Sequence, residues 1–146
     1  MAQVHAVEDV SFTLNAGETL SLVGESGSGK TTAGRSVLRL VEPSSGQVRL
    51  AGQDVIALAP GDLRRARRDM QMIFQDPFAS LDPHMRLYDQ IEEPMLNYGI
   101  GNRAEREARI AGLFDRVELP RSFMRRYPHE MSGGQRQRIA IARALA

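Results

Sequence analysis

The chain has 146 residues, the size of one ordinary domain, and its composition of 42% hydrophobic and 25% charged residues is typical of a globular protein. A formal net charge of +1 argues against a broad polyanion-binding surface, and the absence of cysteine excludes disulfides, cysteine metal sites and a thiol nucleophile. No stretch approaches the roughly 18 apolar residues of a spanning helix, and the N-terminus lacks a signal-peptide pattern. We therefore expect a chain that neither spans a membrane nor is exported by that route.

The first part of the chain predicts β structure followed by a helix. Residues 4–14 alternate loosely between apolar and polar, Asn15–Glu18 has turn chemistry, and Leu20–Val23 is an apolar run. This pattern predicts a hairpin-like β region that leads into a buried strand. A glycine-rich segment follows at once, and Thr31–Leu40 then shows helical spacing of its apolar residues.

The next segment predicts two more strands. Pro43–Gly46 ends the helix, Val48–Leu50 reads as a short strand before a turn, and Met70–Phe74 reads as a strand that ends at Gln75. Between them lies the basic run Arg64–Arg68. Acidic residues flank this run and no aromatic interrupts it, so a solvated helix face is the better interpretation than a nucleic-acid site.

The second half of the chain predicts helices. Three prolines between residues 76 and 98 mark loops and helix boundaries, and Asn102 with Glu105 has the spacing of a capping box. The helix that follows carries one apolar stripe: Ile110, Leu113, Phe114 and Val117. A last helix is expected to begin near Ser132–Gln135 and to run to the final residue. We expect a subdomain boundary after Gln75, giving parts 1–75 and 76–146.

The glycine-rich segment carries the clearest chemistry. Gly24–Thr31 fits the pattern of glycine, four residues, glycine, lysine and a hydroxyl residue, between an expected strand and an expected helix. Glycines let backbone N–H groups turn toward phosphate oxygens, the only lysine of the chain reaches the outer phosphates, and the threonine hydroxyl can ligate Mg²⁺. The predicted nucleotide-binding residues are Gly24, Glu25, Ser26, Gly27, Ser28, Gly29, Lys30, Thr31 and Thr32.

A second glycine feature, Met131–Gln135, also opens a helix. Small residues at a helix N-terminus expose backbone donors to an anion, but Ser-Gly-Gly is also common turn chemistry. From the residues alone, a phosphate contact and a helix cap without a ligand both stay open.

Taken together, these segments resemble the ATP-binding cassette (ABC) ATPases. Gly24–Thr31 resembles the Walker A loop, Gln75 the Q-loop, and Met131–Gln135 followed by Arg-Gln-Arg the signature motif, in the family's order. The strings Phe74–Pro83 and Tyr127–Gln135 look like the ATPase subunits that energise oligopeptide, dipeptide and nickel import. The resemblance covers essentially the whole chain.

The resemblance implies an α/β fold of the P-loop NTPase class, here truncated: an antiparallel β region and P-loop core followed by a helical subdomain. It implies ATP and Mg²⁺ as cofactors, with Thr31 and Gln75 as metal-site residues, Gln75 contacting Mg²⁺ or the attacking water. Two cassettes of the family face each other head to tail. The signature residues would therefore contact a partner's nucleotide: Ser132, Gly133, Gly134 and Gln135.

Three histidines need separate treatment. In the family an aromatic residue stacks on adenine shortly before the first core strand, and His5 falls at that position; it can stack or simply be exposed. His84 and His129 are not expected to be the family's catalytic-region histidine and are interpreted as structural or surface residues.

No run of four apolar residues followed by Asp-Glu occurs in the chain, so the Walker B aspartate, the catalytic glutamate and the switch histidine are expected to be absent. We therefore predict no catalytic residue within the chain, negligible ATP hydrolysis by the chain alone, and exposed apolar surface that favours aggregation or oligomers.

The resemblance implies the ATP-binding part of an importer of peptides or a related solute. Its partners would be a second ATPase subunit, transmembrane permease subunits and, indirectly, a solute-binding protein, with no nucleic acid. Its place would be cytoplasmic, on the inner face of the cell membrane. Two alternatives stay open: a non-transport ABC-type ATPase, and a vestigial or regulatory nucleotide-binding module.

Overall fold

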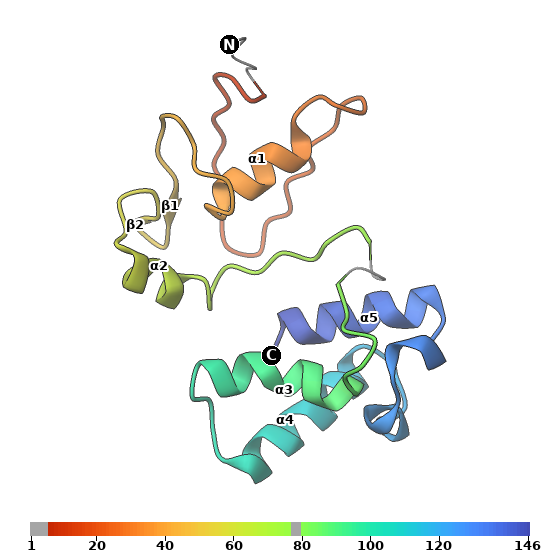
Figure 1. Cartoon of the computed structure of the whole chain (residues 1–146). Helices are drawn as coiled ribbons and strands as arrows, with labels where there is room; N and C mark the ends of the chain where they lie inside the picture. Colours follow the sequence, from red (N-terminus) through yellow and green to blue (C-terminus); the bar gives the residue numbers. More distant parts are fainter. Residues whose placement is uncertain (1–5, 77–79) are drawn as a thin grey trace. The chain divides into compact units, whose positions relative to one another are not determined.

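The computed structural model describes residues 6–76 and 80–146. The chain divides into two compact units, a first unit Met1–Met70 and a second unit Gln71–Ala146 (Figure 1). The subdomain boundary expected after Gln75 stays a prediction.

The first unit contains a helix, a small hairpin and a second helix. Helix α1 spans Lys30–Val37, strands β1 (Arg49–Leu50) and β2 (Gln53–Asp54) pair antiparallel, and helix α2 spans Pro60–Ala66. The two residues between the strands, Ala51 and Gly52, both have positive φ (48° and 83°), the geometry that tight hairpins require. The hairpin therefore forms where the turn chemistry predicts it.

Three of the predicted strands are absent from the described residues. Residues 6–23 and 70–74 have no strand hydrogen bonding, and the predicted buried run Leu20–Val23 is exposed, Val23 by 91%. Within residues 6–23 the Glu18 N–H donates to the Asn15 carbonyl at 3.0 Å, which closes a turn and not a strand pair. A strand is stabilised by its neighbours, and no described segment pairs with these. The predictions of a hairpin-like β region and of a buried strand here are wrong.

A single arginine ties the end of α1 to the hairpin region. The Arg39 guanidinium donates to the carbonyls of Val55 and Leu58 at 3.3 and 2.7 Å, and its own carbonyl accepts from Arg67 at 2.9 Å. Arg64 and Arg65, in α2, are exposed, as a solvated helix face requires. Arg67 instead lies half-buried beyond the C-terminus of α2.

The second unit is helical. It contains α3 (Leu87–Asn97), α4 (Arg103–Arg116), α5 (Gly133–Ala144) and the 3₁₀ helices η1 (Arg121–Arg125) and η2 (Pro128–Glu130). Helix α3 packs against both α4 and α5 (Figure 1). Together these elements bury one apolar core: Leu81, Leu87, Ile91, Met95, Ile110, Leu113, Phe114, Val117, Leu119, Met131, Ile139 and Ala142.

Helix α4 begins and packs as its sequence predicts. The Asn102 side chain accepts from the Glu105 N–H at 3.1 Å, and the Glu105 carboxylate accepts from the Asn102 N–H at 2.8 Å. This capping box satisfies two N–H groups that a helix end leaves without partners. The predicted apolar stripe of this helix is buried in the core.

Helix α3 corrects the interpretation of the prolines. Pro94 lies inside the helix, not at a boundary, and its carbonyl accepts from the Tyr98 N–H at 3.1 Å. Proline removes one helical hydrogen bond, yet the buried side chains of Ile91 and Met95 hold the helix together on either side of it.

An ion pair joins α3 to α4. Arg106 Nε lies 2.9 Å from Glu92 Oε1, with the two side chains 16% and 15% exposed. The Tyr88 hydroxyl donates to the same carboxylate at 3.3 Å, and burial, with the Glu92 charge, raises the pKa of Tyr88.

None of the described helices combines the length and apolar character needed to span a bilayer.

Candidate nucleotide-binding site

The predicted phosphate loop forms a turn that ends at the start of α1. The Ser28 N–H donates to the Glu25 carbonyl at 3.2 Å, and Gly27 and Gly29 have φ of 82° and 87°. Gly29 is the N-cap of α1. Side chains disfavour such positive φ values, so glycine at these two positions lets the chain turn sharply into the helix.

The N-terminus of α1 offers three unpaired donors. The first N–H with a helical partner is that of Ala33, which donates to the Gly29 carbonyl at 2.8 Å, and no side chain caps the helix. Within the described residues, the N–H groups of Lys30, Thr31 and Thr32 have no acceptor. Unpaired N–H groups and the helix dipole are the features that favour an anion at a helix N-terminus.

The lysine ammonium lies on the loop itself. Lys30 Nζ donates to the carbonyls of Gly24 and Glu25 at 2.6 and 2.5 Å and to the Ser28 hydroxyl at 3.1 Å. These contacts are exposed. The ammonium of the only lysine in the sequence is therefore held against the backbone of the loop. A compact point charge of this kind suits a phosphate group.

Space at the loop is tight on one side. A Cβ on Gly29 would overlap the carbonyl oxygen of Ala6, and one on Gly24 would lie 2.7 Å from Ser28 Oγ. At Gly27 a Cβ would meet nothing within 4 Å. Gly29 thus requires glycine for space, because the close atom belongs to the backbone, whereas the Ser28 hydroxyl beside Gly24 can rotate away. Gly27 favours glycine for its backbone angle alone.

The remaining loop residues are accessible. Glu25, Ser26 and Thr31 are exposed, and Thr32 is half-buried. Among the described residues no group of three His, Cys, Asp or Glu could hold a metal ion. A cation here would depend on hydroxyl, amide and phosphate oxygens.

The second predicted site lies in the second unit, at the N-terminus of α5. The Ser132 hydroxyl accepts from the Gln135 N–H at 3.3 Å, and the Gln135 side chain accepts from the Ser132 N–H at 3.0 Å. Ser132, Gly133 and Gly134 are exposed. The segment is a helix cap that also presents its backbone to solvent.

Two arginines of α5 fix this end of the helix, and the sequence reasoning gave them no role. Arg136 donates to the carbonyl of the buried Met131 at 3.1 Å. Arg138 donates to the carbonyls of Val117 and Glu118, at the C-terminal end of α4, at 3.2 and 3.3 Å. A cation near a helix C-terminus is favourable. A basic residue on a neighbouring helix is therefore a signal from which this contact could have been predicted.

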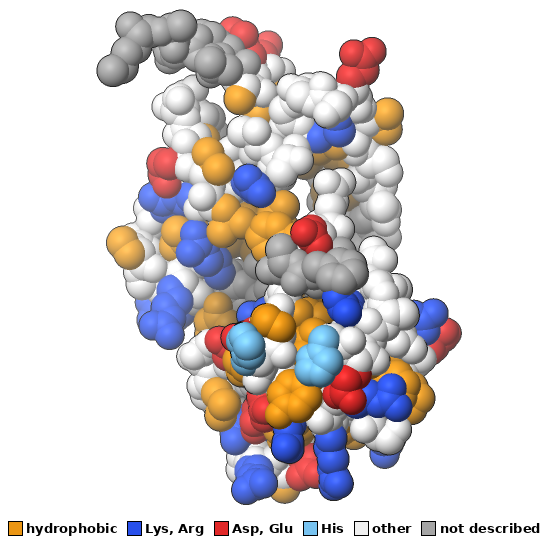
Figure 2. All heavy atoms as spheres, turned by 45° about the vertical axis from the view of Figure 1, so that its right-hand side comes forward, with side chains coloured by type: hydrophobic (Ala, Val, Ile, Leu, Met, Phe, Trp, Pro, Cys, Tyr) orange, Lys and Arg blue, Asp and Glu red, His pale blue; other side chains and the backbone are white. Residues whose placement is uncertain are grey.

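The other predicted residues are one glutamine and three histidines. Gln75 is exposed, in the second unit. His84 and His129 are exposed, and Figure 2 shows histidine side chains at the surface. The His129 ring stacks on Tyr127 with centroids 5.6 Å apart. His5 lies outside the described residues.

These features are those of a loop of the P-loop class: positive-φ glycines, a lysine and an uncapped helix N-terminus. A profile of the ABC transporter family matches residues 7–146, nearly the whole chain. The chain belongs to this family of ABC ATPases, as the order of its motifs predicted.

The curated relatives are named for one kind of ABC protein, the ATP-binding proteins of importers. The chain is 58% identical over 144 residues to the glutathione import ATP-binding protein GsiA of Escherichia coli O157:H7, and equally to that of Shigella boydii serotype 4. The match takes in 99% of this chain but only 23% of those relatives. The chain therefore corresponds to less than a quarter of their length.

Solved structures agree on the fold. The dimeric bacterial ABC transporter cassette MJ0796 is 33% identical, with a TM-score of 0.85 over 97% of this chain and 61% of that one. The same cassette in a post-hydrolysis dimer bound to ADP and Pi gives a TM-score of 0.84. The chain thus follows the path of a P-loop NTPase cassette, although residues 6–23 form no strand.

Proposed function

We propose that the loop Gly24–Thr32 binds the phosphates of ATP. The observation that supports this most directly is the set of three unpaired N–H groups at Lys30–Thr32 beside the Lys30 ammonium. Backbone donors suit the inner phosphates, and the ammonium suits the terminal one. The relative MJ0796 has been solved in a post-hydrolysis state bound to ADP and Pi, the two products of ATP cleavage.

Mg²⁺ is proposed as the second cofactor. The exposed Thr31 hydroxyl lies on the first turn of α1 and can supply one oxygen ligand. The contact of Gln75 with the metal or with a water stays a prediction from the family resemblance. The absence of an acidic cluster among the described residues fits a cation that takes most of its ligands from phosphate and water. The metal would neutralise charge between the outer phosphates.

The segment Ser132–Gln135 is proposed to bind the nucleotide held by a second cassette. Its exposed backbone and its place at a helix N-terminus support an anion contact. The relative MJ0796 is dimeric, which supports a head-to-tail partner of the same kind. The segment can then cap the helix and contact a phosphate at the same time. The cap uses the side chains of Ser132 and Gln135, and the N–H groups of the two glycines stay available for the phosphate.

In its complete form the protein is proposed to energise the import of peptides. The support is the 58% identity to proteins named for import of glutathione, a tripeptide. Permease subunits in the membrane, with a solute-binding protein, would select the solute, and the ATPase would lie on the cytoplasmic face. The 146-residue chain alone is proposed to have negligible hydrolysis, because no acidic pair follows an apolar strand in it.

Nucleotide titration tests the phosphate site. We expect the chain to bind a fluorescent ATP analogue in the presence of Mg²⁺, and Lys30→Ala to weaken binding at least tenfold, which corresponds to about 1.4 kcal/mol. Arg35→Ala is the matched control, because it removes one positive charge from the exposed last turn of the same helix. Equal affinities for Lys30→Ala and Arg35→Ala would contradict the proposed site.

A further inference from the structure

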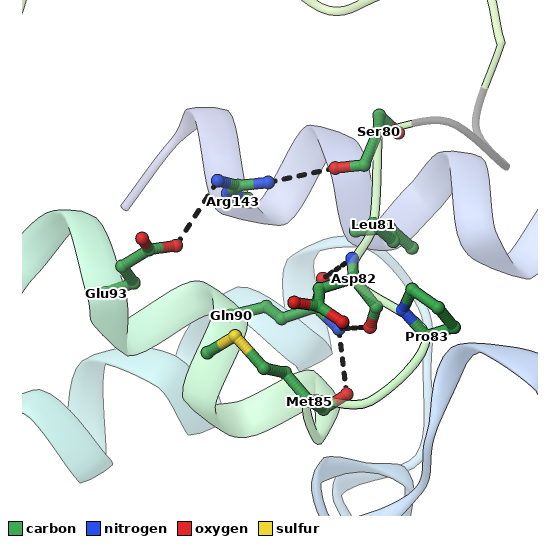
Figure 3. A pocket seen from close by; sticks show the side chains of 8 residues that line it. All are labelled: Ser80, Leu81, Asp82, Pro83, Met85, Gln90, Glu93 and Arg143. Carbon is green, nitrogen blue, oxygen red and sulfur yellow. Dashed lines mark hydrogen bonds and ion pairs between the residues drawn. The ribbon is translucent and has the colours of Figure 1, made fainter.

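One glutamine of the second unit is almost completely buried. Gln90, in α3, is 1% exposed. Its amide NH₂ donates to the carbonyls of Asp82 and Met85 at 3.0 and 2.9 Å, and its amide oxygen accepts from the Asp82 N–H at 2.9 Å. Figure 3 shows the side chain reaching from the helix into the loop that carries these groups. One side chain thus satisfies three backbone groups of the loop Ser80–Met85.

The loop also borders open space. Its residues line a cavity of about 520 Å³ together with Gln90, Glu93 and Arg143 (Figure 3). Leu81 is the loop side chain that is buried in the core, whereas Asp82 and Pro83 are exposed. Because open space adjoins the loop, hydrogen bonds more than packing determine its position, and a buried polar group costs free energy when its partner is removed.

The same loop is tied to the helix that carries the signature segment. Arg143, near the C-terminal end of α5, donates to the Ser80 carbonyl at 2.9 Å and lies 3.3 Å from the Glu93 carboxylate (Figure 3). The Ser80 end of the loop is therefore attached to α5, and the Met85 end to α3 through Gln90.

A further tie leads toward Ser132. Directly after the loop, the Leu87 N–H donates to the carbonyl of Arg126 at 2.9 Å. The Arg86 guanidinium hydrogen-bonds Tyr127, which raises the pKa of the arginine. Arg126 and Tyr127 precede Ser132 by one 3₁₀ turn. The loop itself is thus attached to the far end of α5, and the two residues directly after the loop contact the approach to the signature segment.

We propose that Gln90 is a positioning residue: it makes the loop Ser80–Met85 part of one rigid body with the segment Ser132–Gln135, so that a displacement of the loop reaches the N-terminus of α5. The functional meaning of this link rests on the proposed contact between that segment and a partner's nucleotide. No motif in the sequence marks Gln90.

The test uses two variants of the full chain without nucleotide. Gln90→Met keeps the size of the side chain but removes all three hydrogen bonds, and Gln90→Glu keeps an acceptor for the Asp82 N–H while its carboxylate cannot donate to the two carbonyls. Ile91→Val is the matched control: it trims the adjacent, fully buried residue of α3 and leaves the three hydrogen bonds of Gln90 in place.

Amide exchange and glycine resonances are the readouts. In Gln90→Met we expect the exchange of the Asp82 N–H to rise about tenfold or more, and the Leu87 N–H to follow. In both variants of Gln90 the amide resonances of Gly133 and Gly134 should shift, and in Ile91→Val they should not. Exchange inside α4 should change equally in Gln90→Met and the control, which separates the local effect from global destabilisation.

Two results would overturn the proposal. One is a change confined to Asp82 and Met85, with the glycine resonances of α5 unmoved; the other is an effect of Ile91→Val on those glycines as large as that of Gln90→Met. Nucleotide binding is decided separately, since the Lys30→Ala titration reports on the first unit. Affinity for the ATP analogue should stay within about twofold in the Gln90 variants, as their change lies in the second unit.

Discussion

Substituting the two glycines of the phosphate loop separates backbone strain from lack of space. Gly27 and Gly29 have nearly equal φ, 82° and 87°. A Cβ at Gly27 would meet no atom within 4 Å, but at Gly29 it would overlap the Ala6 carbonyl oxygen. Alanine at either position therefore incurs the same conformational cost, and only Gly29→Ala adds a steric one.

The magnitudes follow from the structure. A left-handed conformation costs an L-residue about 1–2 kcal/mol, which corresponds to a roughly 5- to 30-fold loss of affinity if binding requires the native loop. We expect that loss for Gly27→Ala. Gly29→Ala should lose at least a further tenfold, because the first turn of α1 must shift and its N–H groups with it.

Two measurements check this prediction. Titration with the fluorescent ATP analogue gives the affinities, and amide exchange of Ala33, whose N–H donates to the Gly29 carbonyl at 2.8 Å, reports on the helix start without nucleotide. Equal affinities for the two variants, or an unchanged Ala33 exchange rate in Gly29→Ala, would refute the steric reasoning.

Three further predictions concern the second unit. Arg106→Met, which leaves the half-buried Glu92 carboxylate without its partner at 2.9 Å, should lower the free energy of unfolding by about 1–2 kcal/mol in urea titrations; an unchanged midpoint would contradict this. The Arg121 guanidinium, by hydrogen bonding, holds the pKa of Asp115 below its usual range, so this pair stabilises the fold above the unfolded pKa and loses that contribution as pH falls through the folded one. In Arg121→Ala the NMR titration midpoint of Asp115 should rise, with little change in stability at neutral pH since both side chains are exposed. Glu118→Gly should stabilise the unit by about 0.5–1 kcal/mol in thermal unfolding, because residue 118 has φ 55° directly after the C-cap of α4; destabilisation would show that its exposed ion pair matters more.

Sequence reasoning succeeded where the signal is local. The capping box of Asn102 and Glu105, and the start of α5 at Ser132, depend on residues three apart, and both form as predicted. Pro94 was misjudged because its tolerance in α3 depends on core packing, which propensity does not contain.

Strands were harder for the same reason. The alternation in residues 4–14 and the apolar run Leu20–Val23 describe side chains suited to a sheet, but a strand exists only when another strand satisfies its N–H and C=O groups. The hairpin Arg49–Asp54 forms because only two residues separate its two strands, so each strand finds its partner nearby in the sequence.

The candidate site divides along a similar line. The phosphate loop was predictable because each of its residue types answers a chemical need at a fixed spacing. Gln90 was not, since a glutamine between apolar residues of a helix gives no sign that its partners are the backbone of Asp82 and Met85.

The placement of the core has a consequence for how the chain unfolds. All residues of the main core lie between Leu81 and Ala142, whereas the described part of the first unit buries only Ala33 and Val55 among its apolar side chains. Because the main core lies within the second unit, that unit should behave as one foldon that outlasts the first on heating. A single melting temperature would then describe only half of the chain, and the phosphate loop would lose its structure while the signature helix is still folded.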